Sequence, residues 1–183
     1  ILGGLDVPSS GSITVAGDEI SRLSRAKLAA WRARHVGFIF QMFNLIPYLS
    51  ILDNVLLPLE FSRERRANLE ARRVLPRTEA RRLLGALGLQ DDAMLGRQAT
   101  ALSQGQQQRV AAARALIGQP DVLVADEPTS SLDADARQSF LTLLMQECAS
   151  AGTTVVFVSH DSSLAPLFDR TVAFSSISHR SAA

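Results

Sequence analysis

The stretch "VLVADEPTSSLD", residues 122–133, decides the fold class of this chain. Its first four residues are apolar, which is typical of a strand that is buried on both faces of a sheet. Asp126 and Glu127 follow directly, so we expect two carboxylates at the carboxyl end of that strand, where open α/β sheets bind ligands. One carboxylate can help to hold Mg²⁺ while the next activates a water, as in phosphoryl transfer. The alternative is a strand that simply ends in an acidic turn.

Strand and helix patterns alternate around this stretch. Residues 133–152 predict a helix that Asp133 caps and Gly152 ends. Hydrophobic strands alternating with helices predict an α/β fold with a largely parallel sheet. We expect buried strands over residues 122–125 and 153–160, further strands over 36–41 and 170–176, and a short edge strand or hairpin over 12–20.

The middle of the chain, roughly residues 42–118, interrupts this alternation because it is mostly helical. It is interpreted as a helical subdomain inserted into a catalytic lobe that consists of residues 1–41 and 119–183. One helix, over 79–89, places its apolar residues on a single face. The overlapping stretch 63–82 holds eight arginines and three glutamates. It predicts a solvated helix face, with contact to anionic lipid as the alternative.

The sequence "ALSQGQQQRV", residues 101–110, predicts the start of another helix. Ser103 is a favourable N-cap, and Gly105 lets the backbone approach another group closely. The free N–H groups at such a helix start, together with a serine, form a site suited to an anion. Taken alone, the stretch is better explained as a capped surface helix.

The composition limits the classes of function. The chain has 183 residues, 46% of them hydrophobic, and a formal net charge of +1, so no strong field favours nucleic acid or a membrane surface. Its one cysteine, Cys148, lies in an apolar helical pattern and is expected to be a buried structural thiol. No uninterrupted apolar run approaches the ~20 residues of a membrane helix.

Polar residues follow three of the predicted strands. Gln41 ends the first, Asp126 and Glu127 end the second, and His160 ends the third. Each is weak evidence alone, since a lone glutamine or histidine is usually a surface or capping residue. Because parallel strands end at one edge of a sheet, we expect these four side chains to meet there.

With these motifs, the chain resembles the nucleotide-binding subunit of an ATP-binding-cassette (ABC) transporter. "LSQGQQQR" resembles the family's signature sequence, "VLVADEPT" its Walker B strand, "SSLD" its D-loop, "VSH" its switch histidine and Gln41 its Q-loop. The order and spacing match over nearly the whole chain. Within the family, "VGFIFQMFNLIPYLSILDNVLLPL" is similar to cassettes of the lipoprotein-release and macrolide-export type. The resemblance implies a P-loop NTPase-like α/β cassette.

The resemblance also implies the catalytic roles. Glu127 would be the general base, and His160 would hold the γ-phosphate of ATP. Asp126 would bind Mg²⁺ through water, and Gln41 would sense both Mg²⁺ and the attacking water. ATP and Mg²⁺ are therefore the expected substrate and cofactor.

The family further implies a head-to-tail pair of cassettes that encloses two ATP molecules. The signature residues Ser103, Gly105 and Gln106 would face the nucleotide of the partner cassette, and Asp133 would bridge the dimer. A homodimer is expected, docked on a membrane permease at the cytoplasmic face of the cell membrane, with no nucleic-acid partner. ATP would close the dimer and hydrolysis would open it, driving export or lipoprotein release.

Two departures from the family pattern stand out. Gln104 occupies the place of the first of two signature glycines, and residues 1–183 contain no phosphate loop of the form G-x-x-x-x-G-K-[ST]. The opening "ILGGLD" reads as the tail of the helix that follows this loop. The expectation is a cassette truncated at its N-terminus, lacking the phosphate-loop strand and helix start and inactive alone.

Two alternatives and one surface remain open. The first alternative is a soluble ABC ATPase that acts on nucleic acid or ribosomes. The second is an inactive partial cassette. The segment "FNLIPYL", residues 43–49, is too apolar for an ordinary loop. Phe43, Leu45 and Tyr48 either border a groove for a permease helix or form a local core.

Overall fold

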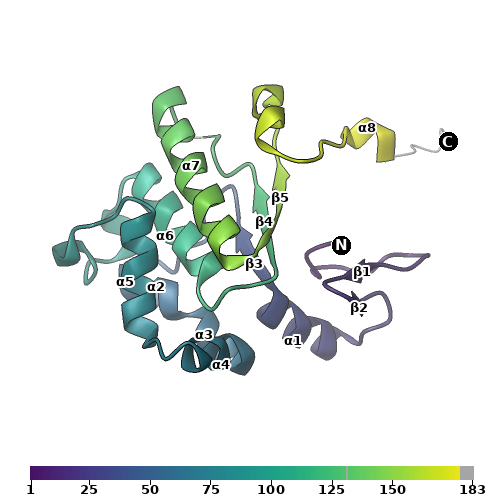
Figure 1. The fold of residues 1–183 in the computed structure, drawn as a ribbon, viewed down its shortest axis with the longest axis horizontal. Helices are drawn as coiled ribbons and strands as arrows, with labels where there is room; N and C mark the ends of the chain where they lie inside the picture. The colour runs from purple at the N-terminus through teal and green to yellow at the C-terminus, as the bar shows by residue number, and fades with distance from the viewer. Residues whose placement is uncertain (131, 178–183) are drawn as a thin grey trace.

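The computed structural model describes residues 1–130 and 132–177, and a parallel sheet lies at its centre (Figure 1). The strands run in the order β3-β4-β5, and β4 lies between the other two. Val36 is opposite Val122, and Val122 is opposite Thr154, so all three strands end at the same edge. Their bounds are β3 Val36–Ile39, β4 Val122–Asp126 and β5 Thr154–Val158.

Two helices cover one face of this sheet, α6 (Gln104–Leu116) against β3 and α7 (Ala134–Ala151) against β5 (Figure 1). The predicted caps of α7 are confirmed: Asp133 accepts a hydrogen bond from the Ala136 N–H at 2.8 Å, and Gly152 ends the helix with φ +68°. The core between these helices and the sheet includes five fully buried residues, Ile39, Leu123, Ala125, Phe140 and Leu144.

A smaller second core lies on the other face of the sheet. The predicted hairpin at residues 12–20 is confirmed as β1 (Thr14–Val15) and β2 (Asp18–Glu19), and helix α1 (Arg25–His35) follows it. Trp31 donates a hydrogen bond to Asp18 at 3.0 Å and stacks on His35, which ties the helix to the hairpin. The residues buried in this core are Ile20, Leu28, Trp31 and Val36.

Short helices fill the chain between β3 and β4, as predicted. The apolar face that the sequence predicts for α5 is buried. It consists of Ala80, Leu83, Leu84 and, directly after the helix, Leu87. They pack into the same large core as α6. The division into lobes 1–41 plus 119–183 and subdomain 42–118 stays a prediction. The bounds are α2 Ile51–Leu56, α3 Pro58–Phe61, α4 Arg63–Ala71, α5 Pro76–Ala86, η1 Asp92–Met94 and η2 Ala99–Ala101.

The arginine-dense stretch is not the uniformly solvated face that the sequence predicts. Arg65 is only 2% exposed, and its guanidinium donates to four backbone carbonyls, those of Arg34, Val36, Ala115 and Ile117. Burial lowers the pKa of Arg65 to about 10, so the group stays charged at neutral pH. Arg65 therefore pins α4 to the junction of α1 with β3 and to the end of α6.

Two predictions about the later strands are wrong. Residues 170–176 form no strand: residues 171–173 are irregular, α8 spans Phe174–Ile177, and no neighbouring strand among the described residues offers the segment backbone partners. Strand β5 is not buried, because Val158 is 48% exposed and only β4 lies beside it in the described part of the sheet. Residues 1–6 form a turn in which the Gly4 N–H donates to the Ile1 carbonyl at 2.8 Å and Gly4 has a φ of +66°, so their expected place at the end of a helix stays a prediction.

The single cysteine lies where the sequence predicts. Cys148 is buried in α7, as predicted. Within residues 1–130 and 132–177, no helix has both the length and the apolar character to cross a bilayer. A short 3₁₀ helix, η3 (Ser162–Leu167), follows β5.

Candidate functional site

The carboxyl edge of the sheet gathers the predicted site residues. Gln41 lies two residues beyond Ile39 of β3, Asp126 ends β4, and His160 lies two residues beyond Val158 of β5. Because the three strands are parallel and in register, these residues all follow the same edge of the sheet. Asp126 pairs directly with Val158 across the sheet. The sequence-based placement of these residues at one edge is therefore reproduced by the sheet register.

Glu127 and His160 are in direct contact at this edge. The Oε1 atom of Glu127 accepts a hydrogen bond from the backbone N–H of His160 at 2.7 Å, and the His160 Nε2 atom lies 3.6 Å from the same oxygen. The Glu127 side chain is 16% exposed, whereas the His160 side chain is 99% exposed. A largely shielded carboxylate thus lies beside an exposed imidazole that a ligand can reach.

The backbone at Glu127 has an unusual conformation that aims the side chain. Its φ is +46°, in the left-handed region that non-glycine residues rarely adopt. The Glu127 N–H continues the strand pairing by donating to the Val158 carbonyl at 3.0 Å. The chain therefore turns sharply directly after β4 while it stays anchored to β5, and such strained positions gather at functional sites.

The signature segment forms the start of α6, as predicted. Ser103 is the N-cap: its Oγ atom accepts from the Gln106 N–H at 3.3 Å, and the Gln106 Oε1 atom accepts from the Ser103 N–H at 3.0 Å. Ser103 is exposed and Gly105 is partly buried. A methyl group on Gly105 would meet the Leu132 side chain at 3.7 Å, so the helix start lies beside the D-loop. Ser131 of the D-loop lies outside the described residues.

Gln106 has a role in the chain that the sequence alone did not assign. Its side chain closes the capping box with Ser103 and thereby satisfies one free N–H group of the helix start. Asp133 likewise caps α7 and is exposed at the surface. In Gln106 and Asp133, the side-chain oxygen that accepts the cap hydrogen bond is already engaged, so a partner would contact the remaining polar atoms of each side chain.

The loop after Gln41 is held by an arginine that the sequence analysis missed. Phe43 and Asn44 both have positive φ, +59° and +48°, and Arg114 of α6 donates to both of their carbonyls at 2.6 Å. Burial lowers the pKa of Arg114. The start of α6 belongs to the signature and its end holds the Q-loop, so one helix joins the two motifs.

The apolar segment after the Q-loop divides between core and surface. Phe43 is only 8% exposed and belongs to the main core, so of the two alternatives the core holds for Phe43 and the groove does not. Leu45 packs partly against the same core, and Tyr48 alone of the three is largely exposed, at 74%. The left-handed turn at Phe43 directs its ring inward, which no residue pattern in the sequence signals.

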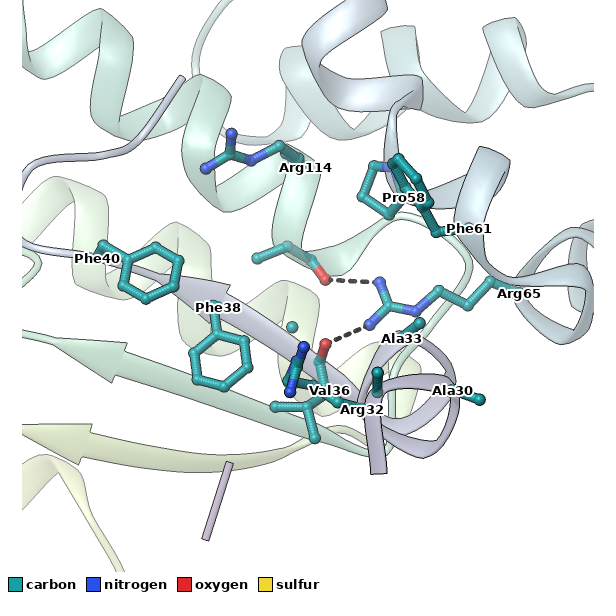
Figure 2. Close-up of a pocket in the computed structure, with 13 residues that line it drawn as sticks. Ala30, Arg32, Ala33, Val36, Phe38, Phe40, Pro58, Phe61, Arg65 and Arg114 are labelled. Carbon is teal, nitrogen blue, oxygen red and sulfur yellow. Dashed lines mark hydrogen bonds between the residues drawn. The ribbon is translucent and has the colours of Figure 1, made fainter. Parts of the chain in front are cut away.

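A groove with an apolar lining does exist nearby, between α1, β3, α3 and the end of α6 (Figure 2). Its volume is about 500 Å³. Phe38 of β3 and Phe40, directly after the strand, stack with ring centroids 5.3 Å apart, and Phe61, 73% exposed, lies on the opposite side of the groove. Arg65 and Arg114 also line it, but backbone carbonyls occupy both guanidinium groups, so the groove presents mainly apolar surface.

The edge of the sheet also carries the oxygen donors that magnesium prefers. Asp126 is exposed and supplies a carboxylate, and Gln41 is exposed and supplies an amide oxygen. Magnesium is commonly bound through one or two carboxylates together with water and phosphate oxygens. The donor set fits such an ion. In the described residues, no group of three or more His, Cys, Asp or Glu side chains is arranged to hold a metal.

Comparisons with known proteins identify the relatives of this chain. The profile of the family described as "ABC transporter" matches residues 1–130. The lipoprotein-releasing system ATP-binding protein LolD of Syntrophotalea carbinolica is 42% identical over 172 residues, covering 94% of this chain and 72% of the relative. The macrolide export ATP-binding/permease protein MacB of Rhodopirellula baltica is 41% identical, but the chain spans only 24% of its length.

A solved structure has the same fold. The dimeric post-hydrolysis state of the ATP-binding cassette MJ0796, bound to ADP and Pi, matches with a TM-score of 0.74 and 36% identity. The match covers 89% of this chain and 68% of that one. The predicted α/β cassette fold and the resemblance to lipoprotein-release and macrolide-export cassettes are confirmed.

Proposed function

The chain belongs to the ABC transporter family, and on that premise we propose that it is the ATP-hydrolysing cassette of an exporter or lipoprotein-release system. The observation that carries this proposal is the contact between Glu127 and His160 at the carboxyl edge of the sheet. ABC cassettes bind ATP with Mg²⁺, and the proposal places both at this edge.

Glu127 acts as the general base for the attacking water. Its Oε1 atom is held by the His160 N–H, while its Oε2 atom makes no hydrogen bond to the described residues and can accept a proton from water. The exposed imidazole of His160 donates to an oxygen of the γ-phosphate. Asp126 and Gln41 would hold Mg²⁺, and the bound ion would neutralise charge on the phosphate oxygens.

The site is completed by a second copy of the cassette. Ser103, Gly105 and Gln106 lie at a helix start whose N–H groups suit a phosphate, and they serve the nucleotide of the partner. Asp133 bridges the two copies. The related cassette MJ0796 forms a dimer, which supports this arrangement for a chain with the same fold.

The groove beside the Q-loop takes a short helix of a membrane permease. Its aromatic walls, Phe40 and Phe61, fit the apolar face of such a helix, and Arg114 links the groove to the loop after Gln41. The cassette would then lie peripherally on the cytoplasmic face of the membrane. The MacB relative, whose name joins an ATP-binding and a permease part, supports this partnership.

The test of the catalytic assignment is Glu127→Gln in the full product of the reading frame. This variant keeps the hydrogen-bond acceptor for the His160 N–H but removes the base, so hydrolysis should fall by about 10²–10⁴ while ATP binding persists. Steady-state phosphate release and binding of a fluorescent ATP analogue measure the two quantities. The dimer should persist on a sizing column with ATP and Mg²⁺.

The matched control is Glu70→Gln, because Glu70 is an exposed glutamate of α4 that lies outside the site. It should hydrolyse ATP at the parental rate. If Glu127→Gln also turned over at nearly the parental rate, the assignment of the base would be wrong.

A polypeptide of residues 1–183 alone is proposed to lack ATPase activity. Phosphate affinity in P-loop proteins comes from the backbone N–H groups of the loop and its lysine, and this sequence has no such motif. Ser103 does not replace it, since the signature serves the opposite cassette. Turnover by residues 1–183, measured beside the full product of the reading frame, would contradict this proposal.

A further inference from the structure

The position of His160 depends on its backbone, because its imidazole is almost entirely exposed and approaches Glu127 only to 3.6 Å. The side chain is 99% exposed, and the residue is anchored on one side by the hydrogen bond from its N–H to Glu127. A second anchor is needed on the other side if the imidazole is to point reproducibly at a ligand. The next residue, Asp161, supplies that anchor.

Asp161 is held from two directions. Its Oδ1 atom accepts hydrogen bonds from the N–H and the hydroxyl of Ser163, at 3.0 and 2.6 Å, and so caps η3. Its Oδ2 atom accepts from the Nη1 atom of Arg137 at 2.6 Å. The hydrogen bonds from Ser163 and, to a smaller extent, the charge of Arg137 lower the pKa of Asp161, so its carboxylate is charged at neutral pH.

Arg137 joins this anchor to the D-loop. It lies in the first turns of α7, and its Nη2 atom donates to the Leu132 carbonyl at 3.3 Å while Nη1 holds Asp161. Its Nε atom is buried and has no hydrogen-bond partner among the described residues. An arginine whose planar group spans two loops fixes their separation in a way that a flexible lysine cannot.

We propose that Arg137 is a positioning residue for His160: by bridging the Leu132 carbonyl and the Asp161 carboxylate, it fixes the backbone that carries the switch histidine. The inference rests on the proposed function, because it assigns His160 a role in ATP hydrolysis. Neither residue of the bridge was singled out by the sequence. An arginine at the start of a helix and an aspartate after a histidine are ordinary surface residues when read alone.

The experiment is Arg137→Gln in the full product of the reading frame, assayed for ATP hydrolysis. Misplacing a catalytic group by about 1 Å can cost up to 10²-fold in rate, so kcat should fall by about 10-fold, with KM for ATP changed less than about twofold. In a His160→Ala background the same substitution should have no further effect, because Arg137 acts only through that histidine. Arg137→Lys should restore only part of the rate.

Two controls separate positioning from folding. Arg66→Gln removes an arginine that makes a comparable ion pair, with Glu60 at 2.8 Å, far along the chain from the site, and should leave kcat unchanged. Amide hydrogen exchange over residues 159–164 should become faster in Arg137→Gln and Asp161→Asn but not in Arg66→Gln. This readout requires no turnover.

The outcomes test the proposed ATPase function and the positioning role of Arg137 separately. A parent protein without ATPase activity would overturn the proposed function, while the exchange data would still judge the bridge. An active parent with unchanged kcat in Arg137→Gln would overturn the positioning role. So would an equal loss in the His160 and His160→Ala backgrounds, because the effect would then not pass through the histidine.

Discussion

At the scale of single residues, buried arginines connect the helical segment to the sheet. Arg65 is the clearest case, since its four carbonyl acceptors belong to α1, β3 and the end of α6. A carbonyl that loses its donor inside the protein leaves an unsatisfied polar group, which costs about 1–3 kcal/mol. The side chain is therefore a structural clamp, although its sequence neighbours are solvated.

The first prediction follows from this clamp. Arg65→Met should lower the free energy of unfolding by at least about 3 kcal/mol, because several buried carbonyls lose their donor together. Arg66→Met, on the same helix and exposed, should change it by less than about 0.5 kcal/mol. Urea unfolding followed by circular dichroism measures both. Similar effects for the two variants would contradict the clamp.

Cys148 carries a second prediction at this scale. It is 2% exposed in α7, and burial raises the pKa of its thiol to about 12. The reactive thiolate is therefore almost absent at pH 7 in the folded protein. A maleimide should label Cys148 only in urea, and the labelled fraction should follow the unfolding curve. Fast labelling of the native protein would show that α7 opens locally.

At the scale of elements, the contact between β3 and α6 is unusually close. A methyl group on Gly37 would lie 2.3 Å from the Ala115 carbonyl oxygen, a backbone atom that cannot move aside cheaply. In α5, by contrast, a methyl group on Gly85 would meet nothing within 4 Å. These two glycines stand in opposite situations, one required by packing and one not.

The third prediction uses this pair. Gly37→Ala should destabilise the fold by more than about 2 kcal/mol, because β3 and α6 must separate. Gly85→Ala should stabilise it by about 0.5–1 kcal/mol, since alanine favours a helix interior over glycine. Thermal unfolding of the two variants gives the signs directly. A neutral Gly37→Ala would mean that β3 and α6 tolerate a wider spacing.

Elements with a local signal were predictable from the sequence, and those that depend on neighbours were not. The caps of α7 and the single apolar face of α5 are written in consecutive residues, and the structure contains both. Residues 170–176 also show a strand pattern, but a strand exists only if another lies beside it. The burial of Phe43, which the sequence leaves open, and that of Arg65, which it does not predict, are both decided by groups distant in the sequence.

At the scale of the whole molecule, the candidate site was predictable as far as sheet topology determines it. Three strands that end in polar residues place Gln41, Asp126 and His160 at one edge once the strands are parallel. The hydrogen bond between Glu127 and His160 and the bridge through Arg137 required coordinates. Both depend on a left-handed turn or on a side chain that reaches between two loops, and neither leaves a periodic pattern.

The same scale exposes a weakness of the sheet. Among the described residues β5 has a neighbour only on the β4 side, and Val158 is 48% exposed. The small core under α1 and the hairpin contacts Val36, Phe38 and Val124 of β3 and β4 but no residue of β5. An uncovered strand with an open edge is a template for pairing with another chain.

The last prediction concerns a polypeptide of residues 1–183 purified on its own. It should associate in a concentration-dependent way, and Val158→Lys should reduce that association, because a lysine on an edge strand opposes pairing. Leu75→Lys is the matched control: Leu75 is 72% exposed but lies between α4 and α5, away from the sheet. Sedimentation velocity over a range of concentrations measures the effect. If both substitutions reduced association equally, general surface hydrophobicity rather than the open edge of β5 would be its cause.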